Sequence, residues 1–286
     1  MASQLFSTAL VVEGGALRGV FSTGILDGFL DTKFNPFDFY IGVSSGASNL
    51  AAYLAEMHGR NGKIYIDYSL RPEFISLARF MYGGHLMDLD WLWDITIREI
   101  RLDLSAIYSK QKPFITVLTD MQTGHAIYKV TSAEDLEHVL KASSAMPFFY
   151  RGYPKVEGRP MTDGGITDAI PVEEAIRRGA RRMMVIRSRK RDYTKRRGLS
   201  ECFMRWYVRR HPQLQHAMAK RVERYNDAVA LIRTPPKGVS IVEICPPENF
   251  RVTRLCRDRH VLQEGYEQGR ALATKAITRW NEMHPI

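Results

Sequence analysis

The amino-acid sequence predicts an α/β fold in which helices cover the faces of a parallel sheet. Two observations in the first sixty residues support this: short apolar runs alternate with segments of helical spacing, and glycine-containing turns separate them. A repeated order of strand and helix is typical of parallel sheets, because each helix carries the chain back to the same end of the sheet. A length of 286 residues suffices for one large domain or two small ones.

The first strands and helices follow in order. Residues 8–12 are an apolar run that ends at a pair of glycines, as expected of a buried strand entering a tight turn. Residues 19–30 carry apolar side chains at helical spacing. Residues 37–43 form a second apolar, aromatic-rich strand, and the alanine- and leucine-rich segment 47–57 follows as a helix.

The later elements are less regular. Further strands are expected at 114–119, 125–130, 182–186 and 239–244, and further helices at 133–143 and 260–283. The pattern between 60 and 113 predicts no defined element. Because no repeat or low-complexity linker divides the chain, we expect one domain over 1–286, with a core of roughly 5–190 and a basic helical extension of roughly 199–286.

The charge balance suggests an anionic partner. The chain has 41 Lys and Arg against 31 Asp and Glu, for a net charge of +10. A nucleic acid, an anionic membrane surface or an acidic substrate would each fit, and a basic surface can also serve solubility alone. A composition of 45% hydrophobic and 25% charged residues excludes wholesale disorder.

The cysteines and the apolar segments bear on the compartment. Three cysteines without a Cys-x-x-Cys pair predict neither a disulfide framework nor a zinc site, and we expect no metal or cofactor. The first residues lack the pattern of a signal peptide, and no apolar run is long enough to span a membrane. We therefore expect a cytoplasmic protein whose membrane contact, where it occurs, is peripheral.

A serine pentapeptide follows the second strand. Gly42-Val43-Ser44-Ser45-Gly46 matches G-x-S-x-G, with the required strand before it and the required helix after it. In such an elbow the serine sits exposed on a strained turn, where the helix N-terminus favours developing negative charge. Ser44 is therefore the candidate nucleophile, and the alternative is an ordinary glycine-serine loop.

A glycine-rich turn follows the first strand, at Glu13-Gly14-Gly15-Ala16-Leu17-Arg18-Gly19. Backbone N–H groups in such a turn can stabilise the oxyanion of acyl transfer, and Arg18 adds a positive charge suited to a phosphate head group. The turn lacks the Lys-Ser/Thr of a phosphate-binding loop, and it only weakly matches a dinucleotide motif. The alternative is a tight strand-to-helix turn with Arg18 in solvent.

Asp163, in Met161-Thr162-Asp163-Gly164-Gly165, is the candidate base. A carboxylate buried against a serine hydroxyl gains basicity, and the adjacent glycines permit close packing. The alternative is a simple Asp-Gly turn. Asp168 competes for the role, but Pro171 places Asp168 near a helix start.

The usual serine hydrolase uses a histidine base instead. The late histidines are His211, His216, His260 and His284. None lies in a glycine-rich turn after a convincing strand, so each is more readily interpreted as a surface residue. An α/β-hydrolase with a late histidine stays open as an alternative.

The three motifs EGGALRG, GVSSG and TDGG, in this order, resemble the patatin-like phospholipases. Ala142-Ser143-Ser144-Ala145-Met146-Pro147 also resembles that family, so the resemblance covers roughly residues 10–172. It implies a three-layer α/β/α sandwich with a mostly parallel central sheet and a Ser-Asp dyad without histidine.

By the same resemblance, Ser44 is the nucleophile and Asp163 the base. The oxyanion donors would be backbone groups around Gly14, Gly15 and Ala16, together with the amide of Ser45. The family often has a further glycine where this sequence has Ala16 and Leu17. The substrates implied are acyl esters of lipids, including phospholipids and lysophospholipids.

Two further segments concern access to the site. The apolar stretch 80–93 suits an acyl channel or a lid, or plain core packing. The basic segment 177–210, interrupted by Trp206 and Tyr207, suits an anionic membrane surface, or a solvated helical face. No nucleic-acid motif is present, so no nucleic-acid partner is expected.

The sequence thus predicts a cofactor-free serine acyl-hydrolase acting on lipids through an acyl-enzyme. Three alternatives remain: a catalytically silent lipid- or membrane-binding protein on the same scaffold, a histidine-dependent esterase, and a nucleic-acid-binding module.

Overall fold

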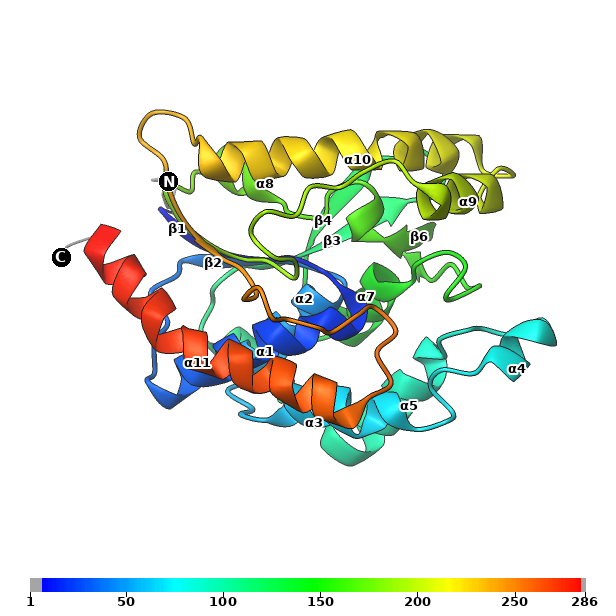
Figure 1. Ribbon diagram of the computed structural model, residues 1–286, viewed down its shortest axis with the longest axis horizontal. Coiled ribbons are helices and arrows are strands. Elements are labelled where there is room, and N and C mark those ends of the chain that lie inside the picture. Colours follow the sequence, from blue (N-terminus) through cyan, green and yellow to red (C-terminus); the bar gives the residue numbers. More distant parts are fainter. Residues whose placement is uncertain (1–6, 284–286) are drawn as a thin grey trace.

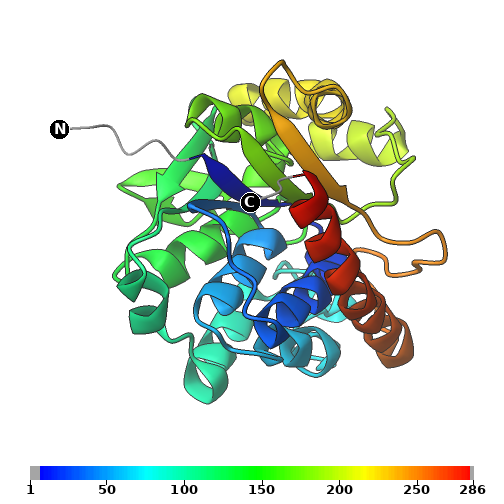
Figure 2. The ribbon, with the colours of Figure 1, turned by 90° about the vertical axis from the view of Figure 1, so that its left-hand side faces the viewer.

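The computed structural model describes residues 7–283, which fold into three layers, helices, sheet and helices (Figures 1 and 2). The first six residues and His284, one of the candidate histidines, lie outside the described residues. The predicted three-layer α/β/α sandwich is confirmed.

The elements have the following bounds. The strands are β1 (Thr8–Val12), β2 (Phe39–Val43), β3 (Phe114–Asp120), β4 (Ala126–Val130), β5 (Lys155–Val156), β6 (Arg159–Asp163), β7 (Arg182–Ile186) and β8 (Ser240–Ile244). The α-helices are α1 (Val20–Asp31), α2 (Ser45–Leu54), α3 (Arg60–Ile66), α4 (Leu77–Met81), α5 (Leu89–Ile100), α6 (Leu104–Ser109), α7 (Leu136–Ser144), α8 (Val172–Arg177), α9 (Leu199–Tyr207), α10 (Pro212–Arg233) and α11 (Arg259–Met283). The 3₁₀ turns are η1 (Ala16–Gly19), η2 (Tyr68–Leu70) and η3 (Gly164–Ile166).

Hydrogen bonds connect the eight-stranded sheet in the order β5-β6-β3-β2-β1-β7-β8, with β4 also paired to β3. The pairings among β1, β2, β3, β7 and β8 are parallel, whereas β4, β5 and β6 pair antiparallel. The prediction of a mostly parallel central sheet therefore holds for its centre, and the antiparallel strands lie at one side.

One edge of β3 serves two partners in succession. β4 pairs with 115–119 of β3, so β2 and β6 must share the opposite edge. β2 pairs with 114–117 and ends where Val43 meets Val117, and β6 takes over where Asp163 meets Leu118. The chain therefore leaves β2 at Ser44 next to the last residue of β6.

Apolar side chains cover both faces of the sheet. On one face β1 and β2 pack under α8 and α10, through residues such as Val11, Ile41 and Val229. On the other face α1, α2, α7 and α11 bury the larger core, which includes Leu10, Phe21 and Trp280. Figure 2 shows α10 on one side of the sheet, with α1 and α11 on the other.

Helices α1 and α11 pack closely along their length, although they lie far apart in the sequence (Figure 1). A Cβ on Gly24 would collide with the backbone oxygen of Tyr266, and one on Gly269 would collide with that of Phe21. Glycines are needed here because the two backbones approach too closely for side chains. The last helix therefore holds the helix that follows the first glycine turn.

The predicted strands and helices are confirmed, with small shifts at their ends. The helix expected at 47–57 begins at Ser45 and ends at Leu54, because Glu56 and Gly59 adopt positive φ. The irregular region 60–113 contains α3 to α6, joined by short turns. Within residues 7–283, no helix has the length and apolarity needed to cross a bilayer.

The basic segment 177–210 does not form one solvated helical face. It runs through β7, a loop and α9, and Arg187 and Lys195 within it are buried. Both point inward because carboxylates, on the buried Glu243 and the partly buried Glu201, pair with them. Exposed basic residues lie on both sides of this buried stretch, at 177–182 and at 191–210.

Candidate active site

Ser44 occupies a sharp turn between β2 and α2, as the pentapeptide predicts. Its backbone has φ 52° and ψ −126°, an unfavourable conformation for a residue with a side chain. A Cβ on Gly42 would collide with Ala47, and one on Gly46 with the backbone of Val12. Both glycines of G-x-S-x-G are thus required because α2 folds back directly onto the strands.

Ser143 supports this turn from α7, a role that the sequence reasoning missed. The backbone N–H of Ser44 donates to the Ser143 hydroxyl at 2.8 Å, and that hydroxyl donates to the Val117 carbonyl at 2.7 Å. Ser143 is fully buried and belongs to the Ala-Ser-Ser-Ala-Met-Pro segment. That segment is the part of the sequence that draws attention to Ser143, but it does not predict the contact with Ser44.

Asp163 lies beside Ser44 at the end of β6. Its carboxylate accepts the Gly165 amide at 2.7 Å, and the Ser44 hydroxyl is close enough to act on its pKa. Burial raises the pKa of Asp163, and the Gly165 amide, the Ser44 hydroxyl and the nearby Arg221 oppose the rise. A Cβ on Gly164 would collide with the Val117 carbonyl, so the following glycine is needed for this approach.

The competing bases are not with Ser44. Among residues 7–283, no histidine lines the cavity around Ser44, and His211, His216 and His260 are exposed. Asp168 accepts a hydrogen bond from the Tyr128 hydroxyl at 2.8 Å, and burial raises its pKa to about 6. Asp168 thus has its own partner, away from the lining of the cavity.

The glycine turn of residues 13–19 lies against the serine turn. A Cβ on Gly14 would stand 2.7 Å from the Val43 carbonyl oxygen and 3.0 Å from the Ser44 Cβ. Ala16 adopts φ 51°, the region that glycine prefers. The turn therefore brings its amides to the serine hydroxyl at some cost in strain.

The amides differ in what they already bind. The Gly15 N–H donates to the Ser45 hydroxyl at 2.9 Å, so it already has an acceptor within the protein. For Gly14, Ala16 and Ser45, the described part of the chain contains no acceptor for the amide. These three residues line the cavity with Ser44.

Arg18 is buried, not solvated. Its guanidinium donates to the backbone oxygen of Ser188 at 3.2 Å. Burial and repulsion by Arg254 and Arg189 together lower the pKa of Arg18 to about 9. Arg18 still lines the cavity, but part of its donor capacity holds the turn to the end of β7.

A buried charged network, named here the Arg187 network, supports the glycine turn from below. Arg187 donates to Glu243 at 2.7 Å and to the Tyr225 hydroxyl at 3.0 Å, and its guanidinium lies 3.9 Å from the Glu13 carboxylate. Tyr225 donates to Glu13 at 3.2 Å. Burial alone would lower the pKa of Arg187, but its partners raise it overall. The residue before Gly14 is thereby fixed.

The cavity beside Ser44 has two chemically distinct ends. The space within it and at its opening to solvent is about 1510 Å³. One end is apolar and is lined by Ile64, Phe74, Met87, Leu92, Trp93 and Phe149, among others. The other end is basic and is lined by Arg18, Arg189, Lys195, Arg221 and Arg254.

The predicted access segment 80–93 divides between two places. Met87, Leu89, Leu92 and Trp93 line the apolar end, whereas Met81 and Tyr82 are exposed at the surface. The second half of the segment is therefore the part that reaches the cavity.

Comparisons with known proteins agree with the motifs. A family model described as "Patatin-like phospholipase" matches residues 10–176, and one described as "Domain of unknown function (DUF6363)" matches residues 211–284. "Uncharacterized protein YjjU" of Escherichia coli (strain K12) is 35% identical over 266 residues, which cover 92% of this chain and 74% of that protein.

Two more distant similarities were found. "Probable lipid hydrolase 463L" of Invertebrate iridescent virus 6 is 25% identical over 195 residues, 59% of this chain and 63% of that protein. The solved structure titled "Crystal structure of VipD from Legionella pneumophila" has a TM-score of 0.48 and 12% identity, over 96% of this chain and 67% of that chain.

Proposed function

The chain belongs to the patatin-like phospholipase family, a family of lipid hydrolases, and from this premise we propose that it hydrolyses acyl esters of phospholipids or lysophospholipids through a dyad of Ser44 and Asp163. The observation that carries the proposal is the position of Ser44 and the buried Asp163 carboxylate, which lie side by side at the ends of β2 and β6 and line the same cavity. A serine needs a neighbouring base to attack an ester, and Asp163 has a raised pKa that suits this task.

In the first step, Asp163 takes the Ser44 proton while the Ser44 oxygen attacks the ester carbonyl. The amides of Gly14, Ala16 and Ser45, which have no other acceptor among the described residues, hold the resulting oxyanion. The alcohol leaves with the proton from Asp163, and an acyl-Ser44 ester remains. Water then attacks this ester, giving a proton to Asp163, and Asp163 passes that proton to the Ser44 oxygen as the bond to the acyl group breaks and the fatty acid departs.

The two ends of the cavity suit the two parts of such an ester. The apolar end takes the acyl chain, since contact with Met87, Leu92 and Trp93 removes the chain from water. The leaving group then lies toward the basic end. We also propose that residues 211–284 work as one unit with the preceding chain, since Tyr225 of α10 belongs to the Arg187 network.

We further propose that the protein docks on anionic membranes through one edge, named here the α4–α9 edge. Its exposed apolar side chains, between 43% and 93% accessible, are Leu77, Met81, Tyr82, Leu199, Phe203 and Trp206. Phe148 joins the two helices, since its ring centroid lies 4.9 Å from that of Phe80 and 5.1 Å from that of Phe203.

Charge and position favour this edge as the membrane contact. Arginines 196, 197, 205, 209 and 210 are exposed along or beside α9. Apolar and aromatic side chains among arginines are typical of surfaces that enter an anionic lipid headgroup layer. Phe149, next to the linking Phe148, lines the cavity, so lipid at this edge would be close to the opening. Figure 1 shows α4 and α9 on the same side of the molecule.

The dyad is tested with Ser44→Ala and Asp163→Asn, and Ser48→Ala serves as the matched control because Ser48 lines the same cavity one helical turn away. Each dyad variant should lose about 10⁴-fold or more in ester hydrolysis, and the control should keep it. A fluorophosphonate should label the wild-type protein at Ser44.

Two outcomes would contradict the proposal. A folded wild-type protein that neither hydrolyses lipid esters nor reacts with the probe is the silent lipid-binding scaffold. Loss of activity on replacing His211, His216 or His260 by alanine would instead identify a histidine base.

A further inference from the structure

The basic end of the cavity holds more positive charge than its neighbours neutralise. Lys195 and Arg221 share Glu201, at 3.0 Å and 3.5 Å, and Arg221 also donates to the Gly165 carbonyl at 2.8 Å. Arg18 is bound to Ser188. These three cations are therefore already engaged with the protein.

Arg254 and Arg189 are the cations left over. The guanidinium of Arg189 stacks on the Tyr193 ring, 4.3 Å from its centroid, a contact that leaves its N–H donors available. For the Arg254 guanidinium, the structure of residues 7–283 contains no hydrogen-bond acceptor and no ion pair, although the side chain lines the cavity. The side chain is partly exposed where it lines the cavity, so its N–H donors are open to a ligand from the cavity.

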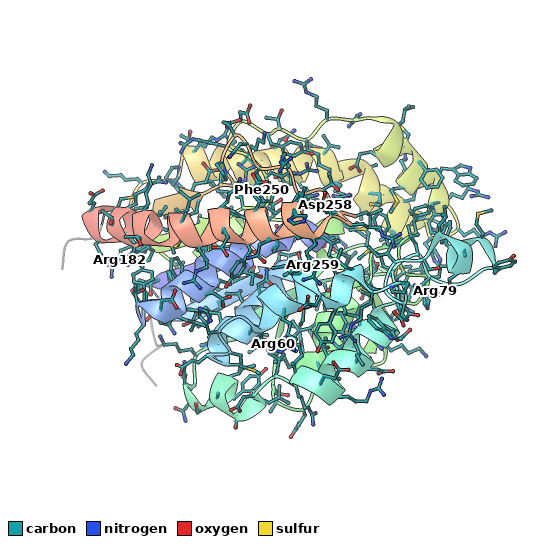
Figure 3. The ribbon with its side chains drawn as sticks, turned by 60° about the horizontal axis from the view of Figure 1, so that its bottom comes forward. Arg60, Arg79, Arg182, Phe250, Asp258 and Arg259 are labelled. Carbon is teal, nitrogen blue, oxygen red and sulfur yellow. The ribbon has the colours of Figure 1, made fainter. Side chains whose placement is uncertain are left out.

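Arg254 lies in the segment between β8 and α11, which passes beside the glycine turn of residues 13–19. The backbone oxygen of Arg254 accepts the Leu17 amide at 3.4 Å, and the Phe250 ring packs on Phe21, with centroids 5.7 Å apart. Figure 3 shows Phe250 and Asp258 of this segment near the first turns of α11. Arg254, Phe250 and Asp258 all lie outside the motif-bearing region 10–176.

The cations also repel one another. Burial and repulsion by Arg221 and Arg189 together lower the pKa of Arg254 to about 10. At neutral pH the group still carries its charge, so the repulsion is unrelieved. An anion bound among Arg254 and Arg189 would relieve that repulsion and satisfy the free donors.

We propose that Arg254, assisted by Arg189, binds the phosphate group on the leaving-group side of the substrate. A guanidinium matches a phosphate with two parallel N–H donors, which makes arginine the preferred residue for this contact. The apolar end of the cavity accounts for the acyl chain, so the phosphate belongs to the alcohol part of the ester. The assignment rests on the proposed function, because it names the substrate chemistry of the same site.

The test compares two soluble esters with the same short acyl chain: a lysophosphatidic acid and a monoacylglycerol. The kcat/KM of each is measured for the wild-type protein, Arg254→Met, Arg254→Lys and Arg257→Met. Arg257 is the matched control, an exposed arginine of the same segment that does not line the cavity. The readout is the ratio of the two kcat/KM values, because Arg254 also lowers the pKa of Asp163 and so affects both esters.

Arg254→Met should lower the ratio of phosphate ester to neutral ester by about 10- to 100-fold, as expected when a charged hydrogen-bond partner is lost. Arg254→Lys should lower it less, and Arg257→Met should leave it unchanged. An equal loss on both esters would overturn the proposal, since Arg254 would then act only through Asp163. No change with either ester would overturn it as well.

Inorganic phosphate distinguishes a lipid phosphate from a free anion. If phosphate inhibits hydrolysis of the neutral ester by the wild-type protein, and Arg254→Met abolishes the inhibition without changing the ratio, the site binds a free anion and the proposal is wrong. If Arg254→Met does not fold, Arg189→Met carries the same expectation for the ratio. A wild-type protein that hydrolyses neither ester refutes the proposed function itself, whereas activity with an unchanged ratio refutes only the phosphate site.

Discussion

Replacement of Arg187 by methionine is a direct test of the Arg187 network beneath the glycine turn. Methionine preserves much of the length and apolar volume of the side chain but removes its charge and its N–H donors. The carboxylate of Glu243 then loses a partner at 2.7 Å, and Glu13 loses a cation at 3.9 Å. Both carboxylates are almost fully buried, so water cannot replace the lost interactions.

The size of the effect follows from this burial. Removing one partner of a buried ion pair costs about 3–5 kcal/mol of unfolding free energy, because an uncompensated charge stays behind. Unfolding entropy is about 2.1 cal/mol/K per residue, so 286 residues give about 0.6 kcal/mol/K. The loss therefore corresponds to a fall in Tm of about 5–8 °C.

The assay is urea-induced unfolding followed by circular dichroism at neutral pH, with thermal unfolding as a second measure. Arg182→Met is the matched control, because Arg182 begins the same strand and is exposed. That control should change the unfolding free energy by less than about 0.5 kcal/mol. Adding Glu13→Gln and Glu243→Gln to Arg187→Met should recover much of the loss, since the buried charges are then gone. An Arg187→Met protein within about 1 kcal/mol of the wild type would refute the reasoning.

Three further predictions concern activity and membrane contact. Burial raises the pKa of Asp163 above its ordinary 3.8, and the carboxylate must be ionised to act as base, so kcat/KM should still rise with pH above 3.8. A profile that is already level at pH 3.8 contradicts this. Gly14→Ala should lower kcat on a neutral ester by about 10²-fold, because the added Cβ would stand 2.7 Å from the carbonyl oxygen that ends β2. Gly198→Ala is the control and should keep both kcat and Tm, because there is open space around Gly198. Trp206→Ser should reduce binding to anionic vesicles roughly 3- to 10-fold in a sedimentation assay without lowering Tm, whereas Val130→Ser, at an exposed apolar position on β4, should leave vesicle binding unchanged.

Local patterns were enough to predict most of the fold. The strands β1 and β2 are uninterrupted apolar runs buried on both faces, and the glycines that bound them mark the turns. β6 was not predicted, because Arg159–Asp163 lacks an apolar run and has a proline at its second position, both weak signals for a strand. Yet β6 is the strand that brings Asp163 to Ser44.

The candidate site was predictable only as far as its motifs reach. Ser44 and Asp163 each lie in a recognisable pentapeptide, although their contact depends on how β2 and β6 share β3. Ser143 and Arg254 act through contacts between residues far apart in the sequence, and no local pattern marks them. Local sequence also does not show whether an amide is free to bind an oxyanion, because this depends on its neighbours. The Gly15 amide, for example, already donates to the Ser45 hydroxyl.

The close pairing of α1 with α11 has a consequence for synthesis of the protein on the ribosome. The amino-terminal half emerges first. The side of α1 that carries Gly24 and Gly28 therefore stays uncovered until α11 has been synthesised. Until then that side stays exposed to chaperones and proteases, which recognise uncovered apolar surface. The architecture thus links maturation of the site to the arrival of one late helix, and a nascent chain that stops before α11 would leave its first helix unprotected.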